Sequence, residues 1–369
     1  MSRSLFALAT GSRPERRRLT RRVLGATLLV GALALSACGG DDTATARELS
    51  DQTGPDGDAA WQDLIKEAQS EGEVVMYGSH AEDTLNKLAT AFEDEYGIKV
   101  TIFRAADNDL EPKLDAEAKT GNHIADLVGM SDETYLKATA ADGGFAEPKG
   151  PALDNPDFDR QANTLAPGVV RSVATTMSYA WNTDLYPDGL TGFEDLLDPA
   201  LAGGKIGILS PFTPAVMDFY TYLEKQFGDD FLDKLAAQKP RIYEAGAAMA
   251  EALASGEITA ASQVSQVSLF DAKDAGAPVD SGLADPAWAA SLYEGVLADA
   301  PHPAAAQLLM NYIFSPAGQE IMAERIASVL PDIPGAAATV DQTTTGGVMT
   351  ASPEEFQAFV DRFNALFHG

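Results

Sequence analysis

Polar and charged side chains gather in the predicted loops that follow short apolar stretches. Residues 73–77 (EVVMY), for example, are followed by Gly78, Ser79 and His80. Hydroxyl and amide groups can hydrogen-bond a polar solute, and imidazole and carboxylate groups can bind a cation. We therefore predict that a ligand site is built from Ser79, His80, Asp107, Asn108, Ser131, Asp132, Ser210, Thr213, Gln263, Ser265 and Gln266.

Several of these residues also have a purely structural interpretation. Ser79, Asp132 and Thr213 are residue types that commonly cap helix N-termini. His80 could be a solvated residue at the start of a helix, and Gln263 could belong to a surface turn. Both interpretations stay open at the level of the sequence.

The sequence lacks the motifs of common enzymes. It has no nucleophile elbow, no zinc-protease His-Glu-x-x-His and no phosphate-binding glycine loop, and it contains four His and one Cys. We therefore expect no enzymatic activity and no cofactor. A pair of carboxylates acting as a cell-wall hydrolase remains an alternative in so acidic a chain.

The elements that must position these residues alternate between strand and helix. Apolar stretches at 73–77, 99–103 and 125–130 predict strands, and the spacing at 79–96 and 106–119 predicts helices, the first of them capped by Ser79. This order predicts a parallel sheet with helices on both faces. Ligands bind such sheets at the carboxyl ends of the strands.

A second α/β set follows near residue 172. Its predicted strands are 173–181, 205–209 and 258–262, and its predicted helices begin after Thr213 and at residue 245. Three further helices are predicted at 303–314, from 315 and at 353–367. The sequence therefore predicts an α/β protein of two lobes, each with a mostly parallel sheet flanked by helices.

The N-terminus has the pattern of an export signal. An Arg-rich segment precedes an apolar run at 23–35 and the small residues Ser36 and Ala37, which is typical of a secretory signal peptide. The run is shorter than the roughly 20 residues that span a membrane. Residues 35–38 resemble a bacterial lipobox, which implies that Cys38 is acylated, and residues 20–24 resemble a twin-arginine signal. We expect residues 1–37 to be removed.

The composition after residue 37 favours an exported globular protein joined to its N-terminus by a flexible tether. Residues 38–58 are rich in Gly, Asp, Thr and Ser, which predicts a flexible segment. Seven of the 26 Lys and Arg and one of the 55 Asp and Glu lie in residues 1–37, so the remainder has a net charge of −35. Such a chain repels phosphate backbones, which excludes nucleic acid as a partner.

Five segments in order resemble the type 2 extracellular solute-binding proteins of ABC importers, in the branch that binds ferric ion, thiamine, phosphonates and polyamines. They are VVMYGSHAEDTLNKLATAFEDEYGIKV, AWNTDLYP with FEDLLDPALAGGKIGIL, AGAAMAEALASGEI, DAKDAGAPVD and APHPAAAQLLMNYIFSPAGQE. The resemblance implies two lobes around a cleft, a small solute, a membrane permease as partner, a monomer and a location on the outer face of the membrane. We place lobe 1 at 59–171 plus about 277–325 and lobe 2 at 172–276, with a C-terminal helical segment at 326–369.

The resemblance leaves the solute open. In the ferric-ion binders a His follows the first strand, which His80 matches, and an acid follows the third, which Asp132 or Glu133 matches. His80 and Asp132 would be the metal ligands if iron is bound. The two adjacent tyrosines of that branch are absent at 260–266, and Tyr179 or Tyr243 would have to replace them. We therefore expect a polar organic solute or oxyanion, with ferric iron or a ferric chelate as the alternative. A sensor for a membrane kinase is a further alternative.

Overall fold

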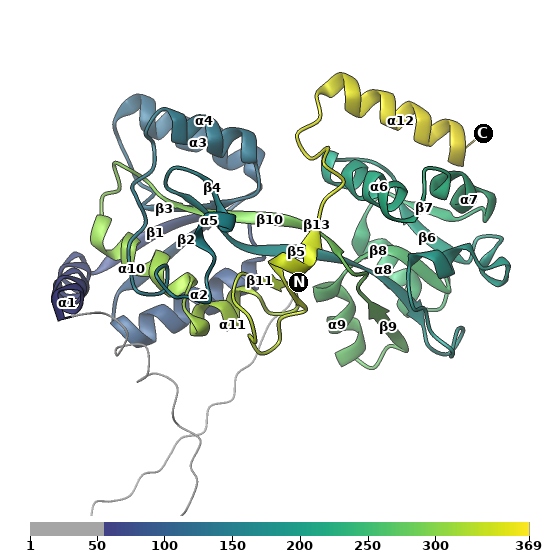
Figure 1. Ribbon diagram of the computed structural model, residues 1–369, viewed down its shortest axis with the longest axis horizontal. Coiled ribbons are helices and arrows are strands. Elements are labelled where there is room, and N and C mark those ends of the chain that lie inside the picture. Colours follow the sequence, from purple (N-terminus) through teal and green to yellow (C-terminus); the bar gives the residue numbers. More distant parts are fainter. Residues whose placement is uncertain (1–54, 369) are drawn as a thin grey trace, which may run out of the picture. The chain divides into compact units, whose positions relative to one another are not determined.

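The computed structural model describes residues 55–368, which form a mixed α/β protein of two lobes (Figure 1). The lobes share two long strands, β5 (Val169–Asn182) and β10 (Ala287–Val296). The other elements of lobe 1 are α1 (Pro55–Glu71), β1 (Glu73–Gly78), α2 (Glu82–Tyr96), β2 (Lys99–Arg104), α3 (Asp107–Thr120), β3 (Leu127–Met130), α4 (Glu133–Ala141), α5 (Arg160–Asn163), β4 (Thr164–Ala166), α10 (Pro303–Ile313), α11 (Pro316–Met322), β11 (Ala327–Ser328) and β12 (Ala338–Thr339).

The sheet of lobe 1 has the strand order β2-β1-β3-β10-β5. Its first three strands are parallel, with Met76 opposite Ile102 on one side and Leu127 on the other. Parallel strands of this kind are covered on both faces, which explains why β1 and β3 are almost wholly apolar. Helix α2 follows β1 and is amphipathic, with Leu85, Leu88, Ala89 and Phe92 buried.

Lobe 2 continues the sheet in the order β5-β8-β6-β7. Strands β8, β6 and β7 are parallel to one another, and β5 is antiparallel to β8. The remaining elements of this lobe are η2 (Phe193–Leu197), η3 (Pro199–Leu201), β6 (Ile206–Leu209), α6 (Pro214–Phe227), α7 (Phe231–Ala237), β7 (Arg241–Tyr243), α8 (Gly246–Ala254), β8 (Ala260–Ser265), α9 (Gln266–Asp274), β9 (Val279–Gly282) and α12 (Pro353–Phe367).

Strand β5 belongs to both lobes. Near its start Val173 pairs with Leu292 of β10, and near its end Ala180 pairs with Ala261 of β8. Strand β10 runs antiparallel to it and reaches β3 at its far end. The two lobes are therefore joined by a pair of antiparallel strands.

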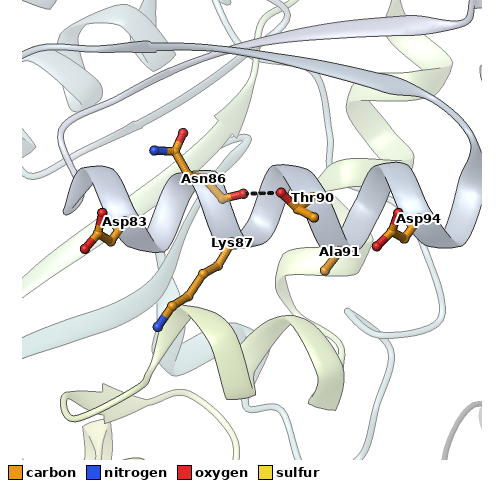
Figure 2. Close-up of a pocket in the computed structure, with 6 residues that line it drawn as sticks. All are labelled: Asp83, Asn86, Lys87, Thr90, Ala91 and Asp94. Atoms are coloured by element: carbon orange, nitrogen blue, oxygen red, sulfur yellow. Dashed lines mark hydrogen bonds between the residues drawn. The ribbon is translucent and has the colours of Figure 1, made fainter. Parts of the chain in front are cut away.

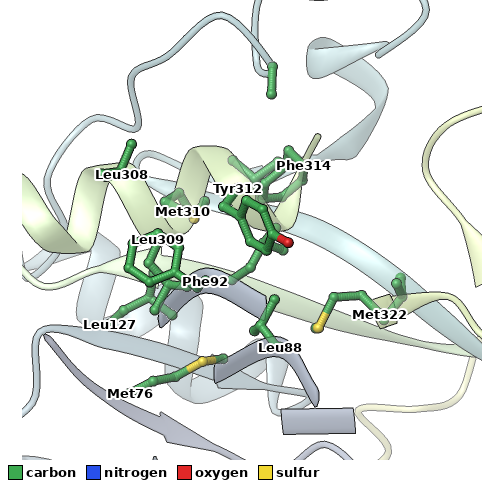
Figure 3. Packing of buried hydrophobic residues seen from close by; sticks show 14 of the residues in the cluster. Met76, Leu88, Phe92, Leu127, Leu308, Leu309, Met310, Tyr312, Phe314 and Met322 are labelled. Carbon is green, nitrogen blue, oxygen red and sulfur yellow. The ribbon is translucent and has the colours of Figure 1, made fainter. Parts of the chain in front are cut away.

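Each lobe has its own core. In lobe 1, Met76 and Leu127 of the sheet pack against Leu88, Phe92 and residues of α10 (Figure 3). In lobe 2 the core is aromatic and includes Phe193, Phe219, Tyr222 and Trp288. Lobe 1 has a further apolar cluster, which includes Tyr77, Leu110 and Val128. Because the clusters of the two lobes are separate, each lobe can behave as one body.

The C-terminal segment contacts both cores in turn. Ala327 of β11 belongs to the core of lobe 1, whereas Phe359 and Phe363 of α12 belong to the core of lobe 2. The chain between them includes η4 (Val340–Gln342) and β13 (Thr343–Thr344), which pairs with β10. Figure 1 shows α12, in yellow, beside α6 and α7.

The predicted fold class is confirmed, and three local predictions are wrong. Helix α1 begins at Pro55, so the last four residues of the predicted tether are helical. Ser79 does not cap α2, because the helix starts only at Glu82 with Ala81 in the capping position. Strand β8 runs to Ser265 rather than 262, because β5 pairs with it along that length.

The predicted signal at 1–37, Cys38 and most of the tether lie outside the described residues. Within residues 55–368, no helix is both long and apolar enough to cross a membrane.

Candidate functional site

His80 lies inside lobe 1 rather than on an open surface. It is 5% exposed, and its Nε2 lies 3.0 Å from Oε1 of the fully buried Glu294 of β10. The atoms are close enough for an ion pair, although their orientation does not make a regular hydrogen bond. Ser172 donates its hydroxyl to the same Oε1 at 3.0 Å. The imidazole therefore already has a carboxylate partner in its own lobe.

Gly129 of β3 makes room for this pair. A Cβ atom at that position would overlap Oε2 of Glu294 and lie 2.7 Å from Cε1 of His80. Only glycine leaves the space that both side chains occupy. The sequence of β3 is thus adapted to the His80–Glu294 contact.

The acids at the ends of β2 and β3 are engaged with neighbouring residues. Asp107 accepts bonds from the backbone N–H and the hydroxyl of Ser131, at 3.0 and 2.5 Å. Asp132 caps α4 by accepting the N–H of Tyr135 at 2.9 Å, which confirms its capping interpretation. Asn108 is exposed. Both acids therefore have partners within lobe 1, although Oδ1 of Asp107 is buried without a hydrogen-bond partner.

The same region is strongly acidic. Burial, followed by the negative charges of Asp132, Asp107 and Asp115, raises the pKa of Glu111 above its usual value. A carboxyl group whose ionisation is opposed in this way shows that the local potential is negative. The α3–α4 side of lobe 1 would repel an anion.

Ser210 and Thr213 precede α6 in lobe 2. Thr213 is the N-cap of α6 with Pro214 in the first turn, as the sequence predicts, and its hydroxyl accepts the N–H of Val216. Ser210 donates its hydroxyl to Glu244 at 2.6 Å. Both hydroxyls therefore have partners within lobe 2.

Strand β8 and the residues beside it leave buried polar atoms without partners. Within residues 55–368, Oε1 of Gln263, Oγ of Ser262 and Oγ1 of Thr176 have no hydrogen-bond partner, and Gln263 is only 3% exposed. Ser265 occupies the N-cap position of α9 without making a side-chain cap bond. Unpaired buried groups are costly, and they are common where a ligand supplies the missing partner.

A cavity of about 550 Å³ lies between the two lobes, and Gln266, the residue that follows β8, is part of its lining. Lobe 2 contributes α9 and β9 to its wall, and lobe 1 contributes the segment after α11. Its size is within the usual range for small-molecule sites. The lining residues are Gln266, Phe270, Ser281, Gly282, Leu283, Glu324, Arg325, Gly335, Ala336 and Ala337.

A second hollow of about 480 Å³ follows the outer face of α2 (Figure 2). Every residue that lines it comes from that one helix, including Asp83, Lys87 and Asp94. A hollow without an opposing wall cannot enclose a ligand. We therefore place the candidate site in the interlobe cavity.

The predicted residues form separate groups. Within the described chain, no hydrogen bond or ion pair joins the His80 group, the Asp107–Asp132 group and the Gln263–Gln266 group, and no three His, Cys, Asp or Glu side chains gather as metal ligands would. Tyr179 donates its hydroxyl to Thr191 inside the core of lobe 2. Of the predicted residues, Gln266 lines the interlobe cavity.

Two residues were missed at the level of the sequence: Glu294, which contacts His80, and Arg325, which lines the interlobe cavity. Glu294 was not singled out, because its partner His80 is more than 200 positions away in the chain. Arg325 was not singled out either, although it is one of the few basic residues of a very acidic chain. Scarcity of positive charge is the signal that could have drawn attention to it.

Comparison with known proteins establishes the family. Residues 74–325 match the family described as bacterial extracellular solute-binding protein, and the chain belongs to it. Members of this family are solute-binding components of ABC transporters, which deliver small ligands to a membrane permease and are not enzymes. A comparison with curated proteins finds no match.

Solved structures share the two-lobed fold at low sequence identity. Iron-bound HitA from Pseudomonas aeruginosa is 18% identical with a TM-score of 0.58, covering 80% of this chain and 98% of its own. AfuA from Actinobacillus pleuropneumoniae, solved with exogenous fructose-6-phosphate, is 20% identical with a TM-score of 0.52, covering 80% and 97%. A putative extracellular solute-binding protein from Bordetella parapertussis is 14% identical with a TM-score of 0.62, covering 80% and 99%.

Proposed function

We propose that this chain is a lipid-anchored, monomeric solute-binding protein that captures a small polar solute in the interlobe cavity and delivers it to an ABC permease. The observation that carries the proposal is a cavity of about 550 Å³ whose wall comes from both lobes. Closing two lobes over a ligand buries it and changes the outer surface that a permease contacts.

The side chains around the cavity favour a hydrogen-bonding organic solute. Gln266 lines the cavity. Gln263 and Ser262, which precede it in β8 and do not line the cavity, have unpaired oxygens. Amide and hydroxyl groups can both donate and accept hydrogen bonds, so they suit a neutral or zwitterionic molecule.

Iron is a weaker candidate for this cavity. Hard ferric iron prefers several anionic oxygen ligands. The lining of the cavity contains one carboxylate, Glu324, which already contacts Lys87 at 2.5 Å. His80 and Asp132, the metal ligands of the iron alternative, have partners elsewhere in lobe 1.

The anchor and the absence of catalysis complete the proposal. Acylation of Cys38 would hold the protein at the outer face of the membrane, and the tether would let the body reach the permease. A cell-wall hydrolase gains no support from the cavity, since its wall has no second carboxylate to pair with Glu324.

A thermal-shift panel tests the proposed solute class. The chain from residue 38 onward, with Cys38→Ser to prevent acylation, is melted with polyamines, thiamine, phosphonates, small carboxylates, sugars, ferric ion and ferric citrate. A ligand at 100 times its Kd stabilises the native state by about 2.7 kcal/mol, which a melting curve resolves. We expect one organic solute to raise the midpoint.

Matched variants locate the binding. Gln266→Ala should weaken binding of that solute about tenfold, whereas Gln357→Ala, the same change on the exposed face of α12, should leave it unchanged. Stabilisation by the iron samples alone would contradict the proposed solute class. Equal effects of the two variants would contradict the proposed site.

A further inference from the structure

Arg325 is held by its backbone in lobe 1. It follows α11, and its neighbours Ala323 and Ala327 are buried in the core of that lobe. Its N–H donates to the carbonyl of Gly335 at 2.7 Å, and Glu324 forms a backbone bridge to Ala336. The position of this residue is therefore determined by lobe 1.

The side chain of Arg325 contacts lobe 2. Nη1 lies 2.8 Å from Oδ1 of Asp271, and Nη2 lies 2.9 Å from Oδ2 of Asp274. The guanidinium carbon also lies 5.0 Å from the ring centroid of Phe270. All three partners are on α9, which packs into the core of lobe 2 through Leu269. One arginine thus joins the two lobes beside the interlobe cavity.

The backbone of Arg325 has a conformation that few arginines adopt. Its φ of 66° lies in the left-handed region, which is unfavourable for residues with a Cβ atom. Such conformations persist where the surrounding structure enforces them, and they concentrate at functional positions. Here the left-handed turn is part of the segment that aims the side chain at α9.

The adjacent acid does not compete for the guanidinium. Glu324 contacts Lys87 of α2, which is also in lobe 1. Glu324 therefore forms its ion pair within lobe 1. Arg325 forms its ion pairs with Asp271 and Asp274 of lobe 2.

We propose that this structure represents the closed arrangement of the lobes, and that Arg325, Phe270, Asp271 and Asp274 form a clasp that stabilises it and must open before a solute reaches the cavity. The clasp regulates the site of the proposed function and therefore rests on it. The aspartate side chains are 70% and 67% exposed, so solvent and salt screen the contact. A screened contact of this kind biases the lobes toward closure but does not lock them.

The test measures the distance between the lobes without needing to know the solute. Cys38 is the single native cysteine, so after Cys38→Ser a pair of labels can be placed by Thr90→Cys on α2 and Glu251→Cys on α8. Both positions are exposed. Spin-label or fluorescence measurements then report the populations of closed and open molecules.

Arg325→Asn should lower the closed-to-open ratio roughly threefold to tenfold. Asparagine tolerates the left-handed backbone and cannot reach α9. Asp271→Asn with Asp274→Asn should give the same shift and keeps Arg325 itself intact. Salt at 1 M should lower the ratio of the unchanged protein and leave these variants unaffected.

Arg362→Asn is the matched control, because Arg362 pairs with Glu224 within lobe 2 alone. If Arg362→Asn shifts the closed-to-open ratio as much as Arg325→Asn, the proposed clasp is contradicted. The clasp is also wrong if the lobes exchange between two distances but the Arg325 variant behaves like the unchanged protein. One fixed distance under all conditions would instead overturn the lobe movement of the proposed function.

Discussion

Polar side chains in the two lobes differ in the contacts that they make. In lobe 1, His80 contacts Glu294, Asp107 binds Ser131 and Asp132 caps α4. In lobe 2, Gln263 and Ser262 of β8, the strand that precedes the cavity-lining Gln266, are buried with unpaired oxygens. The ionisable residues of lobe 1 therefore contact a polar neighbour or cap a helix, although both ring nitrogens of His80, Oε2 of Glu294 and Oδ1 of Asp107 also lack a hydrogen-bond partner. The unpaired groups of β8 are neutral and have no such contact.

This difference separates residues by charge. The groups engaged inside lobe 1 are ionisable, and a buried ionisable group is tolerated only with a partner. The unpaired groups of lobe 2 are neutral amides and hydroxyls. Their desolvation costs less free energy than that of a charged group, so they can remain unpaired until a ligand binds. Substitutions in the two lobes should accordingly have opposite effects on stability and binding.

The largest effect is expected for His80→Leu. The substitution leaves the buried carboxyl of Glu294 without its imidazole, and breaking a buried pair in this way costs about 3–5 kcal/mol. Urea unfolding of the Cys38→Ser chain measures it. The double variant with Glu294→Leu should recover most of the loss, and ligand binding by the folded fraction should persist. If the single variant is stable but no longer binds solute, His80 is a ligand residue, and the proposed difference between the two lobes is wrong.

Gly129→Ala should have the next largest effect. The added methyl group overlaps Glu294 and crowds His80, and overpacking of this kind costs about 1–3 kcal/mol. Gly246→Ala at the start of α8 is the control, because a Cβ there has no neighbour within 4 Å. It should be neutral or slightly stabilising. Equal melting temperatures for the two variants would show that the His80–Glu294 pair is not tightly enclosed.

Gln263→Leu should not destabilise the protein, in contrast to the two substitutions in lobe 1. It removes an unpaired buried oxygen, so the unliganded protein should be unchanged or about 1 kcal/mol more stable, while the ligand-induced thermal shift falls. Gln307→Leu in lobe 1 is the matched control, because Gln307 accepts from Lys149 and donates to Glu147. That variant should lose about 1–3 kcal/mol. Destabilisation of equal size in both would mean that Gln263 is satisfied in solution.

Local signals in the sequence predicted most of the fold. Thr213 and Pro214 begin α6 and Ser315 and Pro316 begin α11, because capping depends only on adjacent residues. The fold class followed from the order of strands and helices. The limits of β8 were misjudged, since they are determined by pairing with β5, which the local pattern does not contain.

The candidate site was harder to predict for the same reason. Strand ends indicated where polar residues gather, but whether His80 is free depends on Glu294, a residue distant in the chain. Arg325 acquires its importance from a left-handed backbone and from partners on α9. Neither feature has a local sequence pattern.

The smallest effect is expected for the pH dependence of Glu117, another engaged acid of lobe 1. Burial opposes its ionisation, but bonds donated by Tyr77 and by the N–H groups of Ile124 and Ala125 outweigh burial, and the pKa is lowered below 4.5. A lowered folded-state pKa stabilises the protein fully above 4.5, and this stabilisation is lost as the pH falls through the lower value.

Glu117→Gln should therefore flatten the stability profile between about pH 5 and 3 relative to the unchanged chain, as followed by urea unfolding at each pH. Glu355 of α12 also has a lowered pKa, because the backbone and side chain of Ser352 donate to it, but it is exposed on lobe 2. Glu355→Gln should flatten the profile less, since solvent screens that carboxylate. A larger change from the lobe 2 variant would mean that buried acids in lobe 1 are not the main source of acid sensitivity, and the contrast between the lobes would then apply to binding alone.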